Sequence, residues 1–351
     1  MGDRTHDFTR TSTTRTLVGR GVATRLREIV DSLEPDGVFL VHDRLLGDAA
    51  HEVALATGAR AAFAIEGGEA TKTIEHAIEL VRTLSHGGAT RGSVVVALGG
   101  GTVCDLVGFV AAIHLRGVRC VLCPTTMLAA CDAALGGKNG VDLDGLKNAV
   151  GTIRQPEAVV ADTRWLATLS DEAFREGLAE VVKKAAVLDA ALFARLEELA
   201  PALVAREDGA VDEVVDAAVA TKMAVVDHDE LEGDRRRWLN FGHTIGHALE
   251  SASGMTLPHG RAVAIGMVAE CRAAGSPAEP RLARLLAALR LPTEVPAGLD
   301  DVDRLHALVA KDKKARSGAV PMVVPAEIGR GELVELTRDR LRRALSTDGS
   351  R

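Results

Sequence analysis

The sequence predicts a first half with a Rossmann-like α/β fold and a second half that is all-α, with the boundary between residues 162 and 163. Up to that boundary, short β-like runs alternate with amphipathic helical stretches, which is typical of a parallel sheet covered by helices. Beyond it, the chain changes to long stretches rich in Ala, Leu, Val and Glu, which are typical of helices. A chain of 351 residues is long enough for two such domains, 1–162 and 163–351.

The individual elements follow from the apolar runs and their flanking residues. In the first half, strands are expected over 37–42, 60–65, 93–98, 118–123 and 158–161, with an amphipathic helix over 73–85. In the second half, helices are expected over 170–199, 211–227, 244–253, 261–274 and 281–290. Ser170 is a suitable N-cap for the first of them, because two acidic residues follow it and suit the helix dipole. Segments rich in Pro and Gly at 275–280 and 292–298 are interpreted as loops.

A glycine triplet stands at the end of the apolar run 94–98. The order is Gly99-Gly100-Gly101-Thr102-Val103-Cys104-Asp105, followed by a helix-like run. A buried strand that leads through glycines into a helix start presents backbone N–H groups to an anion, such as the pyrophosphate of a dinucleotide. The triplet differs from the G-x-G-x-x-G fingerprint, so an ordinary tight turn is an equally good interpretation of these residues alone.

Composition excludes several classes of partner. Lys and Arg number 42 against 49 Asp and Glu, a net charge of −7, so no overall basic field favours nucleic acid or an anionic membrane. No apolar run approaches the roughly 20 residues of a membrane span, and residues 1–15 lack the apolar core of a signal peptide. We therefore expect a cytoplasmic protein. Cys120 and Cys123 have metal-ligand spacing but lie in an apolar strand without a second pair, so buried, inert thiols are expected.

Three histidines in the second half are candidate metal ligands. His243 and His247 are spaced i, i+4 on one helix, and His259 follows in an expected loop before the next helix. No Glu stands beside His243, which excludes the H-E-x-x-H metalloprotease motif. Glu180 lies among apolar neighbours, with Lys183 three residues further on the same helix face. A Glu and two His with an open position would suit zinc as a Lewis acid, although a solvated Glu–Lys pair and ordinary histidines explain the same residues.

Basic residues recur in glycine-rich or polar contexts. Each alone is most simply a surface charge, but glycine neighbours would let an anion reach both the cation and the backbone amides. Together they suit a phosphorylated, acidic substrate. They are Arg116, Lys138, Lys147, Lys222, the run Arg235-Arg236-Arg237, and the run Lys311-Asp312-Lys313-Lys314.

Taken together, the motifs resemble those of the 3-dehydroquinate synthase family of sugar phosphate cyclases, in family order over nearly the whole chain. They are Gly99-Gly100-Gly101-x-x-x-Asp105, Leu115-Arg116-Gly117, Pro124-Thr125-Thr126, Asp132-x-x-x-Gly136-Gly137-Lys138, Gly145-Leu146-Lys147-Asn148, Gly177-Leu178-Ala179-Glu180, Asn240-x-Gly242-His243-Thr244-x-Gly246-His247 and His259-Gly260-x-Ala262-Val263. The resemblance implies a phosphate-eliminating carbon–oxygen lyase of the shikimate pathway or of secondary metabolism. It also implies a homodimer that uses catalytic NAD+ and Zn2+ or Co2+ to convert a 3-deoxy-heptulosonate 7-phosphate to a carbocycle.

The resemblance also implies roles for individual residues. The matching metal ligands are Glu180, His243 and His259. The matching positions around substrate and reaction centre are Arg116, Asp132, Lys138, Asn148, Lys183, Lys222, Arg236, Asn240, His247 and Lys313, of which Lys222 and Arg236 face the carboxylate. The matching nucleotide positions are Asp43, Glu69, Lys72, Gly100, Gly101, Thr102, Asp105, Thr125, Thr126 and Lys147. Arg235 or Arg237 in place of Arg236, and Lys314 in place of Lys313, are open alternatives in register.

Departures from the family pattern keep other substrates open. The chain has Asn139 and Asp142 where the family usually reads G-G-K-T-G-I-N, and Arg261 where it reads H-G-E. An Arg in place of a Glu beside a metal ligand reverses a charge and could retune the pocket. The alternatives are an amino-dehydroquinate synthase and cyclases of the 2-epi-5-epi-valiolone or 2-deoxy-scyllo-inosose type. A polyol dehydrogenase of the glycerol dehydrogenase type and a silent binding protein are weaker alternatives.

Overall fold

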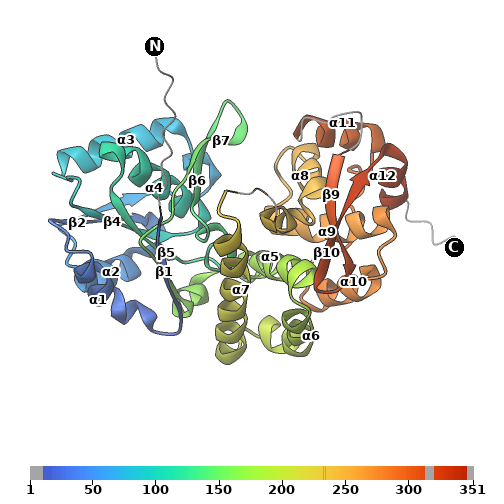
Figure 1. Ribbon diagram of the computed structural model, residues 1–351, viewed down its shortest axis with the longest axis horizontal. Coiled ribbons are helices and arrows are strands. Elements are labelled where there is room, and N and C mark those ends of the chain that lie inside the picture. The colour runs from blue at the N-terminus through green and yellow to red at the C-terminus, as the bar shows by residue number, and fades with distance from the viewer. Residues whose placement is uncertain (1–10, 232, 234, 313–319, 346–351) are drawn as a thin grey trace, which may run out of the picture.

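A six-stranded parallel sheet organises the first half of the chain (Figure 1). The computed structural model describes residues 11–231, 233, 235–312 and 320–345. Every pair of neighbouring strands in this sheet runs parallel. In spatial order the strands are β1 (Arg15–Gly19), β8 (Ala158–Asp162), β5 (Arg119–Pro124), β4 (Val94–Gly99), β2 (Val38–Asp43) and β3 (Ala61–Ile65).

Helices cover both faces of the sheet. Val38 and Leu40 pack in the core formed with α1 (Leu26–Ser32) and α2 (Gly47–Thr57). Phe39 and Val41 point the other way, into the core formed with α3 (Ile74–His86) and α4 (Gly101–Ile113). Because both faces are buried, the central strands are continuous apolar runs instead of alternating ones. This is why they could be predicted from the sequence.

The order of connections reverses between β2 and β4. The chain passes from β2 outward to β3, whereas from β4 it passes the other way, to β5 and then β8. In open α/β sheets, ligands bind at the carboxyl ends of the strands beside such a reversal. Asp43 ends β2 and Gly99 ends β4, so the glycine triplet lies at the position that the topology favours for a ligand.

The second half is helical, as predicted, with one addition. Its helices are α5 (Asp171–Leu188), α6 (Ala190–Val204), α7 (Asp208–His228), α8 (His243–Ala252), α9 (His259–Ala274), α10 (Glu279–Ala288), α11 (Val302–Asp312) and α12 (Arg338–Leu345). An antiparallel hairpin of β9 (Val320–Glu327) and β10 (Arg330–Leu336) packs with them, so this half is not purely α. The expected helix over 170–199 is divided at Asp189, whose extended backbone ends α5 and whose side chain caps α6.

A second hairpin belongs to the first half but stands outside its sheet. It consists of β6 (Lys138–Leu143) and β7 (Leu146–Ile153), and it rises beside the gap between the two lobes in Figure 1. The sequence analysis did not predict this hairpin, nor the edge strand β1. The domain boundary after residue 162 stays a prediction.

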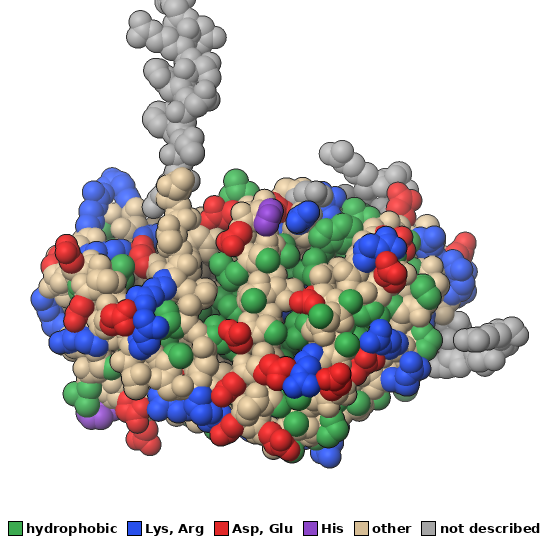
Figure 2. Space-filling model, turned by 60° about the horizontal axis from the view of Figure 1, so that its bottom comes forward, with side chains coloured by type: hydrophobic (Ala, Val, Ile, Leu, Met, Phe, Trp, Pro, Cys, Tyr) green, Lys and Arg blue, Asp and Glu red, His purple; other side chains and the backbone are tan. Residues whose placement is uncertain are grey.

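The outer surface carries mixed charge. On the face drawn in Figure 2, acidic and basic side chains alternate and do not gather by sign. Among the described helices, none combines the length and the apolar character that a membrane crossing requires.

Candidate active site

The glycine triplet forms the tight turn between β4 and α4. Gly100 occupies the N-cap position, and no side chain in the described part of the chain caps the first amides of the helix. A Cβ on Gly99 would lie 2.6 Å from Cβ of Val103, and one on Gly100 would lie 3.0 Å from Cγ2 of Thr126. Glycine is therefore required for the close packing of this turn, and the helix start presents its N–H groups as an anion site.

The predicted nucleotide-binding residues surround this turn. Asp43 ends β2, Glu69 and Lys72 follow β3, and Thr125 and Thr126 follow β5. Lys72 pairs with Asp105 of α4 at 2.5 Å, and the Thr125 amide donates to the Gly99 carbonyl at 2.9 Å. Thr102 lies in the first turn of α4. Loops from four neighbouring strands thus bring these positions together at one edge of the sheet.

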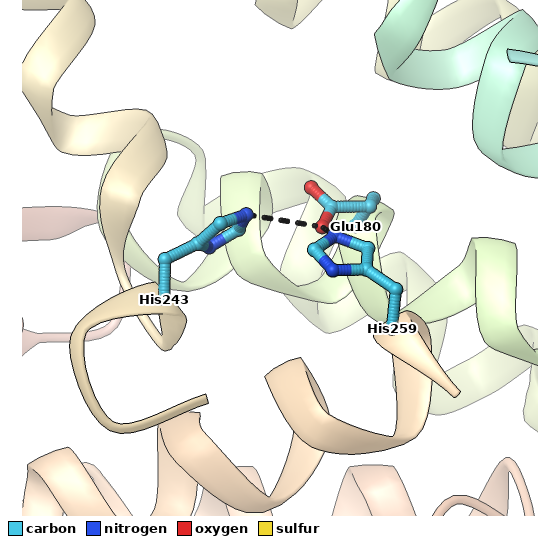
Figure 3. Close-up of side chains that lie close together, drawn as sticks. All are labelled: Glu180, His243 and His259. Carbon is cyan, nitrogen blue, oxygen red and sulfur yellow. Dashed lines mark ion pairs between the residues drawn. The ribbon is translucent and has the colours of Figure 1, made fainter. Parts of the chain in front are cut away.

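The three predicted metal ligands converge from three helices (Figure 3). Glu180 of α5 is completely buried, and its Oε1 lies 3.6 Å from Nε2 of His243 on α8 and 3.4 Å from Nε2 of His259 on α9. One atom from each residue lies within 4.8 Å of the others, a spacing that can hold a metal ion. His259 is the first residue of α9, so its expected position in a loop before the helix was wrong.

Hydrogen bonds orient both histidine rings toward Glu180. Nδ1 of His243 lies 3.1 Å from the Phe241 carbonyl oxygen, and Nδ1 of His259 lies 3.2 Å from Oε2 of Glu250. Each acceptor favours the tautomer with the proton on Nδ1, which leaves the Nε2 lone pair available for a metal. Oε1 of Glu180 faces both imidazoles, and Oε2 pairs with Nζ of Lys183. One carboxylate and two imidazoles with an open position fit a catalytic zinc-type site.

Charge around the ligands shifts their pKa values in opposite directions. Burial opposes ionisation of Glu180, but Lys183, His243 and His259 outweigh it and hold the pKa of this carboxyl well below its ordinary value. Burial, together with Lys183, lowers the pKa of His243 to about 3. Burial also disfavours the charged form of His259, but Glu180 and Glu250 outweigh it and raise the pKa to about 9. A proton and a metal ion therefore compete for His259.

A buried charge cluster lies between the glycine turn and the triad. Asp132 belongs to a short π-helical segment (Ala129–Ala133) after β5, a feature often found at functional sites. Its carboxylate pairs with Lys222 of α7 at 2.8 Å and lies 3.9 Å from Nζ of Lys183, which in turn pairs with Glu180. A Cβ on Gly101 would lie 3.4 Å from Cβ of Ala133, so the cluster adjoins the helix start.

Lys183 and Lys222 of this cluster are both buried, and burial and neighbouring charges shift their pKa values in opposite directions. Burial and the neighbouring lysines lower the pKa of Lys222 to about 8, although Asp132 opposes that shift. Burial would also lower the pKa of Lys183, but Asp132 and Glu180 outweigh it and raise that pKa. A further anion placed here would be attracted to the buried ammonium groups.

One arginine of the run 235–237 points inward. Arg236 is 2% exposed and donates to the carbonyl oxygens of Gly136 at 2.8 Å and Glu230 at 2.7 Å. Arg235 is exposed, and Arg237 donates to the carbonyl of Gly233 on the outside of the turn. The geometry therefore favours Arg236 over its neighbours as the residue that faces a ligand.

The other predicted substrate residues lie on several different elements and differ in their exposure. His247 lies beside the triad, with its ring centroid 5.1 Å from that of His243 and 6.0 Å from that of His259. Asn240 ends the short helix before α8 and is partly exposed. Lys138 and Asn148 are exposed on the β6–β7 hairpin. Lys313 and Lys314 lie outside the described residues.

One predicted residue lies apart from the site within a single chain, and another lies beside the metal triad. Arg116 follows the C-terminal end of α4, whereas the glycine turn lies at its N-terminal end, about 20 Å away for a helix of this length. It does not join the cluster within one chain. Lys147 lies at the start of β7 and pairs with Glu250 of α8 at 3.3 Å.

Two carboxylates that the sequence analysis missed support the triad. Glu250 accepts from His259 and pairs with Lys147. Glu270 of α9 is completely buried and accepts hydrogen bonds from the amides of Gly242 at 2.7 Å and Ile245 at 2.9 Å. It thereby caps the start of α8, where His243 stands. Their spacing from the histidines along the helices carried no motif, so only the fold identifies them.

The cysteines are buried, as the sequence predicted for Cys120 and Cys123. All five cysteines are buried and free, and burial raises the pKa of Cys120 and Cys123 well above the ordinary value.

Arg261, which replaces a family Glu, is exposed and lowers the pKa of the half-buried Glu176, although burial of Glu176 outweighs this effect.

Most of the chain is similar to known 3-dehydroquinate synthases. Residues 62–176 match the N-terminal model of 3-dehydroquinate synthase, and residues 177–315 match its C-terminal model. A 3-dehydroquinate synthase from Sulfolobus acidocaldarius is 40% identical over 287 residues, which are 79% of this chain and 81% of that protein. The curated relatives thus match most of their own length.

Solved structures agree with the fold. The 2-epi-5-epi-valiolone synthase from Streptomyces hygroscopicus, with NAD+ and Zn2+ bound, has a TM-score of 0.86 at 28% identity and covers 97% of this chain and 98% of its own. A 2-deoxy-scyllo-inosose synthase with carbaglucose-6-phosphate, NAD+ and Co2+ has a TM-score of 0.84 at 26% identity and covers 95% of both chains. The predicted fold class is confirmed.

Proposed function

Because the chain belongs to the 3-dehydroquinate synthase family, we propose that it is a phosphate-eliminating carbon–oxygen lyase that converts a 3-deoxy-heptulosonate 7-phosphate to a carbocycle. The observation that carries this proposal is the continuous arrangement of a helix start, a buried cation cluster and a Glu/His/His triad. A dinucleotide, an acidic sugar phosphate and a divalent metal would each find a complementary site there.

Glu180, His243 and His259 are the proposed ligands of Zn2+ or Co2+. The buried carboxylate of Glu180 directs Oε1 toward Nε2 of both histidines, which supports this assignment. A bound metal would act as a Lewis acid toward a hydroxyl or carbonyl oxygen of the substrate. His247 lies at the edge of the triad, in reach of a ligand held there.

The carboxyl ends of β2, β3, β4 and β5 form the proposed NAD+ site. Bound NAD+ would take a hydride from a ring alcohol and return it later in the same turnover. The amides at Gly100, Gly101 and Thr102 would hold the pyrophosphate. Asp43, Glu69, Lys72, Asp105, Thr125, Thr126 and Lys147 complete the proposed set.

Lys222 and Arg236 are the proposed partners of the substrate carboxylate. Both are buried, and an arginine fork matches the geometry of a carboxylate. Lys138, Asn148 and Asn240 are proposed to hold the phosphate and ring hydroxyls, together with Lys313. We propose a homodimer in which Arg116 serves the second copy, because Arg116 lies far from the site of its own chain.

A different substrate remains as the second candidate. The two cyclase structures compared above are named for 2-epi-5-epi-valiolone and 2-deoxy-scyllo-inosose, and the latter contains a phosphorylated carbasugar without a carboxylate. The buried Arg236 and the presence of Asn240 favour a carboxylated substrate over these neutral ones. The 4-amino analogue is also carboxylated, so Arg236 does not discriminate against it.

A substrate panel tests the proposal. Purified protein with NAD+ and Zn2+ is offered 3-deoxy-arabino-heptulosonate 7-phosphate, its 4-amino analogue, sedoheptulose 7-phosphate or glucose 6-phosphate. Released phosphate and NADH absorbance are followed together. We expect phosphate release from the first compound with no net NADH. Release only from a sugar without a carboxylate contradicts the substrate assignment, and stoichiometric NADH indicates a dehydrogenase.

A further inference from the structure

Glu250 joins the two lobes of the molecule at the metal triad. This α8 residue is only 4% exposed, and its two carboxylate oxygens face different partners. Oε2 lies 3.2 Å from Nδ1 of His259, and Oε1 lies 3.3 Å from Nζ of Lys147 on the β6–β7 hairpin. The same carboxylate therefore touches a proposed metal ligand and a proposed nucleotide-binding residue.

The hairpin is in turn attached to the proposed nucleotide site. The amide of Asp142 donates to the Lys72 carbonyl at 2.8 Å, and Lys72 pairs with Asp105 beside the glycine turn. The Asp142 carboxylate accepts from the Asn148 amide at 2.7 Å, next to Lys147. A contiguous chain of polar contacts thus runs from α4 through the hairpin to His259.

The two contacts of Glu250 differ in how easily they exchange. Lys147 is 43% exposed at its side chain, so water can replace Glu250 around its ammonium group when the pair opens. Glu250 and His259 are held by their helices. The contact between Glu250 and His259 therefore remains when Lys147 leaves.

We propose that Glu250 is a positioning residue that couples metal binding to dinucleotide binding through exchange of Lys147. This inference rests on the proposed function, since it needs a metal on the triad and a dinucleotide at the strand ends. A dinucleotide that draws Lys147 away leaves the full negative charge of Glu250 to the His259 N–H. A stronger hydrogen bond at Nδ1 makes Nε2 more basic, so the metal binds more tightly.

The coupling must act equally in the other direction. A metal on Nε2 of His259 polarises the Nδ1–H group and strengthens its bond to Glu250, which weakens the hold of Glu250 on Lys147. Lys147 is then released toward the dinucleotide. By thermodynamic linkage, each ligand raises the affinity of the other by the same factor, and couplings of this kind are typically about 5- to 150-fold.

The test compares Co2+ affinity with and without saturating NAD+. Co2+ is titrated into metal-free full-length protein against a competing chelator, with its visible absorption as the signal, and the number of ions per chain is determined. The variants are Glu250→Gln, Lys147→Met and, as a matched control, Glu327→Gln, which removes an exposed carboxylate whose Arg330 pair lies on the β9–β10 hairpin.

We expect NAD+ to raise the Co2+ affinity of the unmodified protein about tenfold. Glu250→Gln should lower Co2+ affinity about 10- to 100-fold without NAD+ and abolish the NAD+ effect. Without NAD+, Lys147→Met should bind Co2+ about as tightly as the unmodified protein does with NAD+, and NAD+ should have no further effect. Glu327→Gln should retain the full effect.

Distinct results would overturn the inference and the proposed function. If NAD+ and Co2+ both bind but the affinity of one is independent of the other, or if the coupling survives in Glu250→Gln, the inference is wrong. Two Co2+ ions per chain would make Glu250 a ligand with His247 and His259, which also lie within 4.8 Å, and would likewise refute it. If the unmodified protein binds no Co2+ or no NAD+, the proposed function fails as well.

Discussion

Gly266 fixes the spacing of the two helices that carry the histidine ligands, and Gly266→Ala should separate them. A Cβ at this position of α9 would lie 2.1 Å from the carbonyl oxygen of Gly242 and 2.8 Å from the amide nitrogen of Gly246. Gly242 is the N-cap of α8 and Gly246 lies in its first turn; both atoms are backbone, so no side-chain rotation relieves the contact. His243 starts that turn, whereas His259 stands on the same helix as Gly266.

The size of the effect follows from these distances. Real Cβ contacts essentially never fall below 3.0 Å, so the α8 backbone must retreat by about 0.9 Å from the 2.1 Å position. Metal sites tolerate errors in ligand distance of only about 0.2 Å. We expect Gly266→Ala to weaken Zn2+ or Co2+ binding by at least about 100-fold. Overpacking should also cost about 1–3 kcal/mol of the free energy of unfolding.

Chelator competition measures the metal affinity, and urea unfolding of the metal-free protein measures stability. Gly209→Ala is the matched control, because a Cβ at this position in α7 meets nothing within 4 Å. The control should bind metal normally and lose no stability, since alanine is the better helix former. Unchanged metal affinity in Gly266→Ala would refute the claim that α8–α9 packing sets the ligand spacing.

Three further changes test other parts of the site. Glu270→Gln should leave one amide of the α8 start without an acceptor and lower the free energy of unfolding by about 1–3 kcal/mol in urea titrations; an unchanged value would exclude the capping role. Arg236→Met should reduce kcat/KM for the carboxylated substrate about 10- to 100-fold, whereas exposed Arg235→Met should not, and equal losses would contradict the assignment. Because burial lowers the pKa of Lys222 to about 8, its ammonium is lost above that pH, so kcat/KM should fall about tenfold per unit there; a flat profile to pH 10 would refute a role for its charge.

The sequence predicted the central sheet and the triad for different physical reasons. Strands such as β4 are buried on both faces and are therefore continuous apolar runs, which composition alone identifies. Glu180, His243 and His259 come from helices far apart in the sequence, and spacing alone left a metal site undecided. The resemblance to a family identified these three residues as metal ligands, and the structure places their ligand atoms close together.

Other features were missed because a local signal was not used, because proline obscured a strand, or because the partners are distant in the sequence. The β6–β7 hairpin has a two-residue Asp144-Gly145 turn with φ values of 49° and 77°, which is a strong hairpin signal. Only Gly145 entered the interpretation of the sequence, as part of a family motif. Pro321 and Pro325 obscured β9. Glu250 and Glu270 look like ordinary helical charges until the fold places His259 and the α8 amides beside them.

The central claim is that Glu180, His243 and His259 hold the metal on which turnover depends. The most direct measurement is the metal content of purified protein, with phosphate release from 3-deoxy-arabino-heptulosonate 7-phosphate, for the unmodified chain, Glu180→Ala and His259→Ala. We predict one Zn2+ or Co2+ per unmodified chain, and loss of both metal and turnover in each variant. A variant that keeps its metal or its turnover would contradict the account.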